Sequence, residues 1–337
     1  MFTLAASSSD DQFASFDVAA WEWGAFIVLV SVLLLIDVLF VHRTAHAVRG
    51  REAAIESAVW ISIGLLFGVV VLWWHGGGAA GEYYAGYLIE KSLSVDNVFV
   101  WAVILSYFAV PREYQFRVLF WGIFGALVLR AIFIFAGVAL ISAFSWILYV
   151  FGAFLLYTAW KIAFHDQTEV DPDKSLVLRA FRRVFPSVNE YEGQKLFIRK
   201  NGRRLATPLF AVLVMIESTD VVFAVDSIPA ILAVSREPFI VFSSNAFAIL
   251  GLRSLYFLLA DMKDRFRYLN TGLGVILAFV GVKMLLTDLY HFPTSIALGV
   301  ILATLTVSVL TSLRADRREA REVSGAPHES SQEPGSL

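Results

Sequence analysis

Carboxylates inside long apolar segments are the chemically distinctive residues of this sequence. Three of them, Glu217, Asp220 and Asp226, lie in the stretch ESTDVVFAVDSIP, and two more, Glu90 and Asp96, lie in the stretch EKSLSVDN. A charged side chain at the centre of a bilayer costs roughly 2.5–3.5 kcal/mol on insertion scales, so such residues usually serve a function. We expect the two stretches to build one cation site.

Neutral oxygen donors accompany these acids. Asn97 directly follows one carboxylate and Ser227 directly follows another. Ser94 lies four residues after Glu90, on the same face of a helix. Each acidic stretch therefore offers a carboxylate together with a neutral ligand.

Two further oxygen donors lie elsewhere, Asp37 in the first apolar segment and Asn245 in the seventh. Carboxylate and amide oxygens suit hard divalent cations, with water completing the coordination shell. The chain has no cysteine, which excludes disulfides and thiolate ligands. We expect a hard divalent cation such as Mg²⁺, Ca²⁺ or Mn²⁺ at this site, and no tightly bound cofactor.

The spacing of the acids limits how they can bind an ion. Glu90 aligns with Asp220 and Asp96 with Asp226, and the members of each stretch are six residues apart. Six residues turn a helix by 600°, so the two side chains point about 120° apart. Either they face different neighbours or the helix unwinds between them, and Pro229 favours a local break in the sixth segment.

Cations in the apolar segments offer a structural alternative. They are Lys91, Arg130, Lys161, Arg253 and Lys283. Buried acids and bases could simply neutralise one another, and we expect Arg130 and Arg253 to act as such counter-ions. However, six acids face five cations, and Lys161 and Lys283 lie near segment ends, where their long side chains can reach the interface. The remaining acidic excess favours a site for cations or protons.

The composition is that of a polytopic membrane protein. Hydrophobic residues make up 58% of the 337 residues, charged residues only 17%, and the mean hydropathy is +0.69. This predicts an all-α membrane helix bundle, with the lipid bilayer as partner. Nine apolar segments are long enough to span a bilayer, at about 21–41, 57–74, 84–108, 116–140, 144–164, 206–234, 239–260, 269–289 and 294–313.

The positive charges orient these segments. The predicted inner loops carry 21 Lys or Arg residues and the predicted outer loops carry one, Arg236. By the positive-inside rule, the N-terminus is expected outside and the C-terminus in the cytoplasm, in the plasma membrane. Residues 1–20 have no basic start and are expected to form an extracytoplasmic arm rather than a signal peptide. Residues 314–337 are polar and are expected to be disordered.

An internal repeat is visible within the predicted transmembrane domain, residues 21–313. GALVLRAIFIF around Arg130 resembles AILGLRSLYFL around Arg253, and VFGAFLLYTAWK resembles GLGVILAFVGVK. These pairs define two three-helix repeats, 84–166 and 206–288. Three spans are an odd number, so the copies must be inverted, as in many secondary transporters.

The connector at residues 167–205 joins the two repeats. Within it, KLFIRKNGRRLAT is expected to form a hairpin, because Asn-Gly is a favoured turn. We interpret the connector as a solvated cytoplasmic loop, with a regulatory role left open.

At these motifs the sequence resembles the TerC/Alx family of integral membrane proteins, within the wider LysE-type transporters. EKSLSVDN (90–97) and ESTDVVFAVDSIPA (217–230) carry the resemblance, supported by NAFAILGLRSLYF (245–257). It implies manganese-type metal efflux, with Glu90, Asp96, Glu217, Asp220 and Asp226 as the ion path. The family name comes from tellurite resistance. Tellurite is an anion, and an acidic membrane site has the wrong charge to bind it.

Three classes of function remain distinguishable. The favoured one is a secondary transporter that exports a divalent cation, with protons as the counter-ion. The alternative is a membrane scaffold that supports metalation of exported enzymes or envelope stress resistance without transporting anything. An intramembrane enzyme is disfavoured, because the sequence has no Ser/His, HExxH or GxGD pattern, and no nucleic-acid partner is expected.

Overall fold

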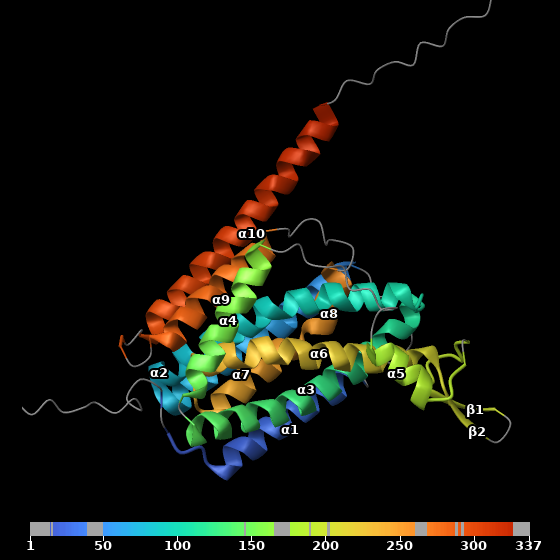
Figure 1. Cartoon of the computed structure of the whole chain (residues 1–337), viewed down its shortest axis with the longest axis horizontal. Coiled ribbons are helices and arrows are strands. Elements are labelled where there is room, and N and C mark those ends of the chain that lie inside the picture. Colours follow the sequence, from blue (N-terminus) through green and yellow to red (C-terminus); the bar gives the residue numbers. More distant parts are fainter. Residues whose placement is uncertain are drawn as a thin grey trace, which may run out of the picture.

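Figure 1 shows the computed structural model of the chain, a bundle of long helices with one small hairpin. The structure describes residues 14, 16–38, 50–144, 146–164, 176–188, 190–200, 203–259, 268–286, 289–290 and 293–325. Its elements are α1 (Ala20–Ile36), α2 (Gly50–Tyr107), α3 (Arg112–Ala143), α4 (Ile147–Phe164), α5 (Leu176–Val184), β1 (Phe197–Lys200), β2 (Arg203–Ala206), α6 (Pro208–Leu232), α7 (Pro238–Leu250), α8 (Leu252–Leu259), α9 (Leu269–Leu285) and α10 (Thr294–Gly325).

Within the described residues, each of the nine predicted membrane segments overlaps a helix, and the seventh overlaps both α7 and α8. The second and third share α2, which is interrupted at Gly76, where φ is 83° and ψ is −176°. Only glycine adopts such a conformation readily, so Gly76 separates two helices. By length and apolar composition, five helical segments can cross a membrane, and the described part of the chain holds three shorter apolar helices as well. The protein is an all-α polytopic membrane protein.

Close helix packing depends on small residues. α4 lies along α9, and a Cβ added at Gly152 would come within 3.0 Å of the carbonyl oxygen of Gly281. A Cβ added at Gly281 would come within 2.9 Å of the carbonyl oxygen of Gly152. The two backbones therefore touch at a point where neither helix has room for a side chain.

The contacts between the two predicted repeats are reciprocal. The second half of α2 contacts α7, where a Cβ at Gly86 would meet the Ser244 hydroxyl at 2.8 Å, and α3 contacts α6, where a Cβ at Gly122 would meet Ile216 at 3.0 Å. The first helix of each repeat thus lies against the second helix of the other. A two-fold relation between repeats would give this exchange, and their inverted orientation stays a prediction.

The connector carries the predicted hairpin. β1 and β2 are antiparallel, with Phe197 opposite Ala206 and Lys200 opposite Arg203. Asn201 and Gly202, the predicted turn, lie outside the described residues. α5 precedes the hairpin and buries Leu178 and Phe181 in the same core as the start of α6, so both elements stand at the N-terminal end of α6 (Figure 1).

The described part of the N-terminal arm lies on the bundle. The backbone N–H of Ala14 donates to Glu82 at 2.6 Å, and the ring of Phe16 stacks on His75 with centroids 4.0 Å apart. His75 also lies 3.3 Å from Glu22 of α1. Residues 1–13 and 15 of the predicted arm lie outside the described residues.

Two expectations need correction. α6 is one continuous helix from Pro208 to Leu232, so the predicted break near Pro229 does not occur. Pro229 lies inside this helix. Membrane helices tolerate proline because neighbouring helices and side chains satisfy the backbone groups that it frees. Residues 314–325, predicted to be disordered, continue α10 to Gly325 because Arg, Glu and Ala favour helix. Residues 326–337 lie outside the described part.

Candidate functional site

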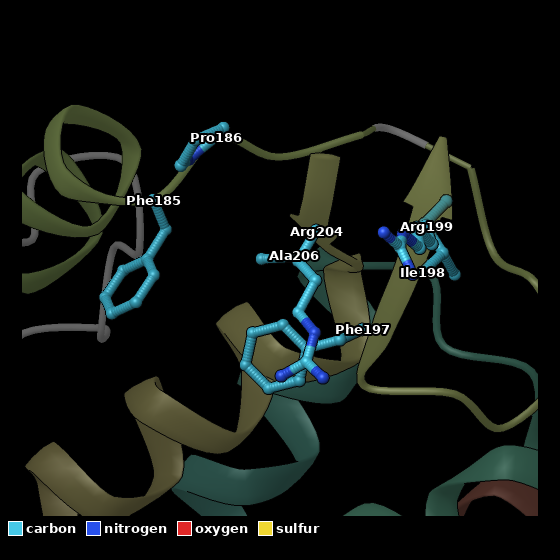
Figure 2. A pocket seen from close by; sticks show the side chains of 7 residues that line it. All are labelled: Phe185, Pro186, Phe197, Ile198, Arg199, Arg204 and Ala206. Atoms are coloured by element: carbon cyan, nitrogen blue, oxygen red, sulfur yellow. The ribbon is translucent and has the colours of Figure 1, made fainter. Parts of the chain in front are cut away.

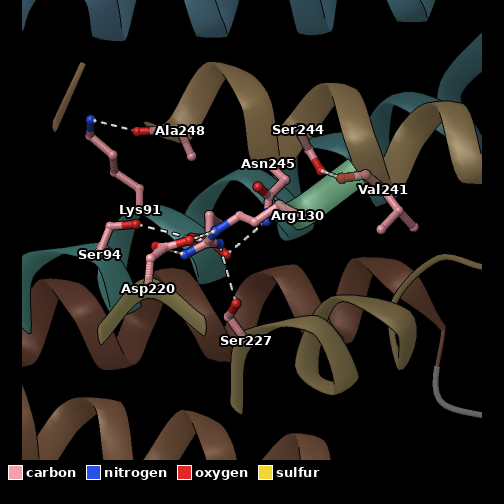
Figure 3. A network of polar contacts seen from close by, with 10 residues as sticks. Lys91, Ser94, Arg130, Asp220, Ser227, Val241, Ser244, Asn245 and Ala248 are labelled. Atoms are coloured by element: carbon pink, nitrogen blue, oxygen red, sulfur yellow. Dashed lines mark hydrogen bonds and ion pairs between the residues drawn. The ribbon is translucent and has the colours of Figure 1, made fainter. Parts of the chain in front are cut away.

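The centre of the site is Arg130 on α3, whose side chain is fully buried. Its guanidinium forms an ion pair with Glu90 of α2 and another with Asp220 of α6. Nη2 and Nε of Arg130 donate to the two carboxylate oxygens of Asp220, at 3.0 and 3.3 Å (Figure 3). A planar guanidinium is suited to this two-bond arrangement, because its N–H groups match the spacing of carboxylate oxygens.

Neutral donors complete the surroundings of Glu90. The Ser94 hydroxyl donates to Oε1 of Glu90 at 3.0 Å, and Nδ2 of Asn245 on α7 donates to its Oε2 at 3.0 Å. On the other side, Oγ of Ser227 accepts from Nη1 of Arg130 at 3.3 Å. These contacts come from α2, α3, α6 and α7, with Ser227 bonded to Arg130 rather than to Asp226 and Asn245 donating through its amide nitrogen.

The two acids six residues apart on α6 face different neighbours. Asp220 is buried against Arg130, whereas Asp226 is half-buried and accepts a hydrogen bond of 3.1 Å from the Thr158 hydroxyl on α4. This is the first of the two arrangements that the 120° separation allowed. On α2, Asn97 is buried, and the side chain of Asp96 lies outside the described part of the structure.

Glu217 lies one turn before Asp220 on α6 and points at a gap in α3. The gap is Gly125: a Cβ there would lie 2.0 Å from Oε1 of Glu217. Oε2 of Glu217 is buried and has no hydrogen-bond partner among the described residues. Oδ1 of Asn245 is also buried and lacks such a partner in the same part of the chain. The site thus holds two oxygens that could accept further bonds.

Arg253 on α8, which the sequence aligns with Arg130 in the predicted repeats, has a different partner. It forms an ion pair with Asp37, at the end of α1, and its guanidinium carbon lies 4.0 Å from the centre of the Phe116 ring. Lys91 donates to the backbone carbonyl of Ala248 at 3.2 Å. Asp37 therefore belongs to a second buried ion pair and is separate from the Arg130 group.

Sequence reasoning missed three contributors to these groups: Gly125, Thr158 and Phe116. A glycine, a threonine and a phenylalanine are common in membrane helices, so their composition carries no signal. Their roles come from the facing helix. The described residues hold no cluster of three or more His, Cys, Asp or Glu side chains arranged to hold a metal ion. In this conformation the acids of the central site surround an arginine.

Comparison with known proteins identifies the family. The family described as "Integral membrane protein TerC family" has a sequence model that matches residues 75–320. The chain belongs to the TerC family. It is 48% identical to an Escherichia coli K12 protein named "Putative membrane-bound redox modulator Alx", over 316 residues that cover 90% of this chain and 97% of that protein.

Two further relatives carry less specific names. A Myxococcus xanthus protein named "Uncharacterized membrane protein STKORF319" is 47% identical over 306 residues, covering 90% of this chain and 96% of that protein. A Rickettsia bellii protein named "Uncharacterized membrane protein" is 36% identical over 292 residues, covering 87% and 97%. No solved structure matches. The family and the apolar helices establish a membrane-embedded protein.

Proposed function

We propose that this protein exports a divalent metal cation, Mn²⁺ foremost, in exchange for protons. The observation that carries this proposal is the meeting of Glu90 and Asp220 at one buried positive charge. The two carboxylates come from the first helices of the two predicted repeats and occupy aligned positions in them. In transporters built from repeats, the substrate site lies at this kind of interface.

The charge balance supports a divalent ion. Glu90 and Asp220 together carry two negative charges, and Arg130 supplies one positive charge. A divalent cation that took the place of the guanidinium would neutralise both carboxylates. Arg130 then acts as the counter-ion of the empty site, because two unpaired carboxylates would be costly in the membrane.

The available ligand atoms are all oxygens. Oε2 of Glu217 and Oδ1 of Asn245 are buried without hydrogen-bond partners in the described structure, and both lie on helices that contribute to the Arg130 group. Together with the carboxylates of Glu90 and Asp220 they form a hard donor set, which suits Mn²⁺, Ca²⁺ and Mg²⁺. Asp226 and Asp96 lie further along the same helices and extend the proposed path.

Proton exchange follows from the ligand chemistry. A carboxylate binds metal only in its deprotonated form, so a proton that arrives at Glu90 or Asp220 favours release of the ion. Transport from a cytoplasm with few free metal ions towards an acidic exterior would use the proton gradient. We place the N-terminus outside and the C-terminus in the cytoplasm of the plasma membrane, on the charge asymmetry of the loops.

The name of the Escherichia coli relative describes it as a redox modulator. This chain has no cysteine and therefore no thiol for such chemistry. A transporter that controls the level of a redox-active metal would also affect redox state, which links the proposed metal export to the relative's name. We likewise attribute any effect on tellurite resistance to metal balance, because a site lined with carboxylates repels an oxyanion.

Flux through proteoliposomes tests the proposal. Purified protein is expected to move Mn²⁺, and this flux should rise when a pH gradient is imposed. Glu90→Gln and Asp220→Asn, which keep the shape and remove the charge, should each abolish it. Glu113→Gln, an exposed acid at the start of α3, is the matched control and should leave flux unchanged. Absence of flux with Mn²⁺, Ca²⁺ and Mg²⁺ would favour the scaffold alternative.

A further inference from the structure

The connector between α4 and α6 concentrates positive charge at one end of the bundle. Residues 176–206 contain eight Lys or Arg residues and two acids. They form α5 and the β1–β2 hairpin, which stand beside the first turn of α6 (Figure 1). Because α6 is long and apolar enough to cross a membrane, this basic segment lies where the bundle meets the lipid headgroups.

The hairpin register places like charges opposite each other. Arg199 is paired with Arg204, and Lys200 is paired with Arg203. Directly opposed like charges destabilise an antiparallel pair unless an anion lies between them. Since side chains alternate across a strand, the two pairs lie on opposite faces of the hairpin. The Arg199–Arg204 face also carries Phe197 and Ala206.

That face borders an open pocket of about 590 Å³. Phe185 and Pro186, which follow α5, form the other wall, and Figure 2 shows Phe185 across the hollow from Phe197 and Arg204. The Phe197 ring lies 4.4 Å from Phe210, in the first turn of α6, between ring centroids. The pocket therefore combines two guanidinium groups with an aromatic wall that continues into a membrane helix.

We propose that this pocket binds an anionic phospholipid of the leaflet that borders this end of the bundle. The phosphate lies between Arg199 and Arg204, and the upper part of an acyl chain lies on Phe185 and Phe197. This inference does not depend on metal transport. It assigns a lipid-binding site to the connector, which the sequence analysis interpreted as a solvated loop.

A lipid fits the pocket better than a soluble phosphate compound. Phe197 is 45% exposed, Phe185 is 38% exposed, and the neighbouring Val184 is 67% exposed. Three exposed apolar side chains next to a basic group are typical of segments that lie in the membrane interface. A small hydrophilic anion would leave this apolar surface in water.

Native mass spectrometry of the whole protein in detergent tests the proposal. The wild-type chain is expected to retain phosphatidylglycerol at least about tenfold more tightly than phosphatidylcholine. Arg199→Gln with Arg204→Gln should weaken phosphatidylglycerol binding by roughly 10- to 30-fold, because it removes both charge-assisted contacts with the phosphate.

Lys200→Gln with Arg203→Gln is the matched control. It removes the same charge from the same hairpin, at two residues that do not line the pocket, and should change the affinity by less than about twofold. Equal losses of phosphatidylglycerol affinity in both double variants would show that only diffuse electrostatic attraction holds the lipid. That result would overturn the proposal.

A second comparison separates lipid from soluble phosphate. Phe197→Ser should weaken binding of phosphatidylglycerol, and glycerol 1-phosphate, which has the headgroup phosphate and no chains, should not compete. Competition by glycerol 1-phosphate or ATP at concentrations similar to those of the lipid would show a site for soluble anions and overturn the assignment. The thermal midpoint of each variant checks that the hairpin has folded.

Discussion

Arg130 holds Asp220 through two hydrogen bonds, from Nη2 at 3.0 Å and from Nε at 3.3 Å, while its Nη1 contacts Glu90. One guanidinium thereby joins α2, α3 and α6 at their buried centre. The three charges are interdependent, since removal of Arg130 leaves both buried carboxylates without a positive partner.

Removal of the central cation should be strongly destabilising. We expect Arg130→Gln to lower the free energy of unfolding by about 3–5 kcal/mol, because it leaves two buried carboxylates without a positive partner. The measurement is thermal or denaturant unfolding in detergent.

The neutral triple variant Arg130→Gln, Glu90→Gln and Asp220→Asn is the control for this prediction. It should recover much of the lost stability, since no unpaired charge remains. A single Arg130→Gln variant as stable as wild type would contradict a role for Arg130 as counter-ion.

The close approach of Glu217 to Gly125 of α3 gives a second prediction. Gly125→Ala places a Cβ 2.0 Å from Oε1 of Glu217 and must displace the carboxylate. We expect a loss of about 1–3 kcal/mol in unfolding free energy, together with reduced Mn²⁺ flux. Gly122→Ala, one turn earlier, meets Ile216 at 3.0 Å and serves as the control. If both variants transport normally, Glu217 is not on the ion path.

The second ion pair can be tested through its aromatic neighbour. Phe116→Leu removes the ring that lies under Arg253 and should cost about 0.5–2 kcal/mol of stability, the usual range for a cation–π contact. Phe120→Leu, one turn along α3, makes the same change away from the guanidinium. Equal destabilisation by the two variants would show that packing volume alone accounts for the effect.

Glu237 lies in the turn before α7, outside the membrane segments. Its carboxyl leads us to expect that the stability of the fold depends on pH. Burial raises the pKa of Glu237 above its ordinary 4.5, opposed by a hydrogen bond from the N–H of Phe239 and assisted by the charge of Asp17. A carboxyl whose pKa is raised in the folded state stabilises the fold at low pH, and this contribution is lost as the pH rises through the folded-state value.

Glu237→Gln should therefore raise the thermal midpoint at neutral pH, and this gain should vanish below the ordinary pKa of 4.5. The exposed Glu113→Gln is the control and should give no pH-dependent difference from wild type. A gain of equal size across the pH range would show that charge at Glu237 is not the cause.

Much of the architecture was predictable because it depends on local composition. Long apolar segments must form helices in a membrane, since the backbone finds no water there to bond. Interruptions by Gly76 and by the polar connector divide those segments. For the same reason the acids of the central site stood out in the sequence: Glu90, Asp220 and Glu217 are charged side chains where charge is expensive.

The partners of those acids were decided by tertiary structure. The helices are apolar on nearly all sides, so periodicity does not say which face meets which neighbour. Arg130 and Arg253 occupy aligned positions in the predicted repeats, yet one joins Glu90 to Asp220 and the other reaches Asp37. Only the rotation and register of the packed helices could determine these partners. Rotation and register depend in turn on where small residues, such as Gly125, allow two helices to approach closely.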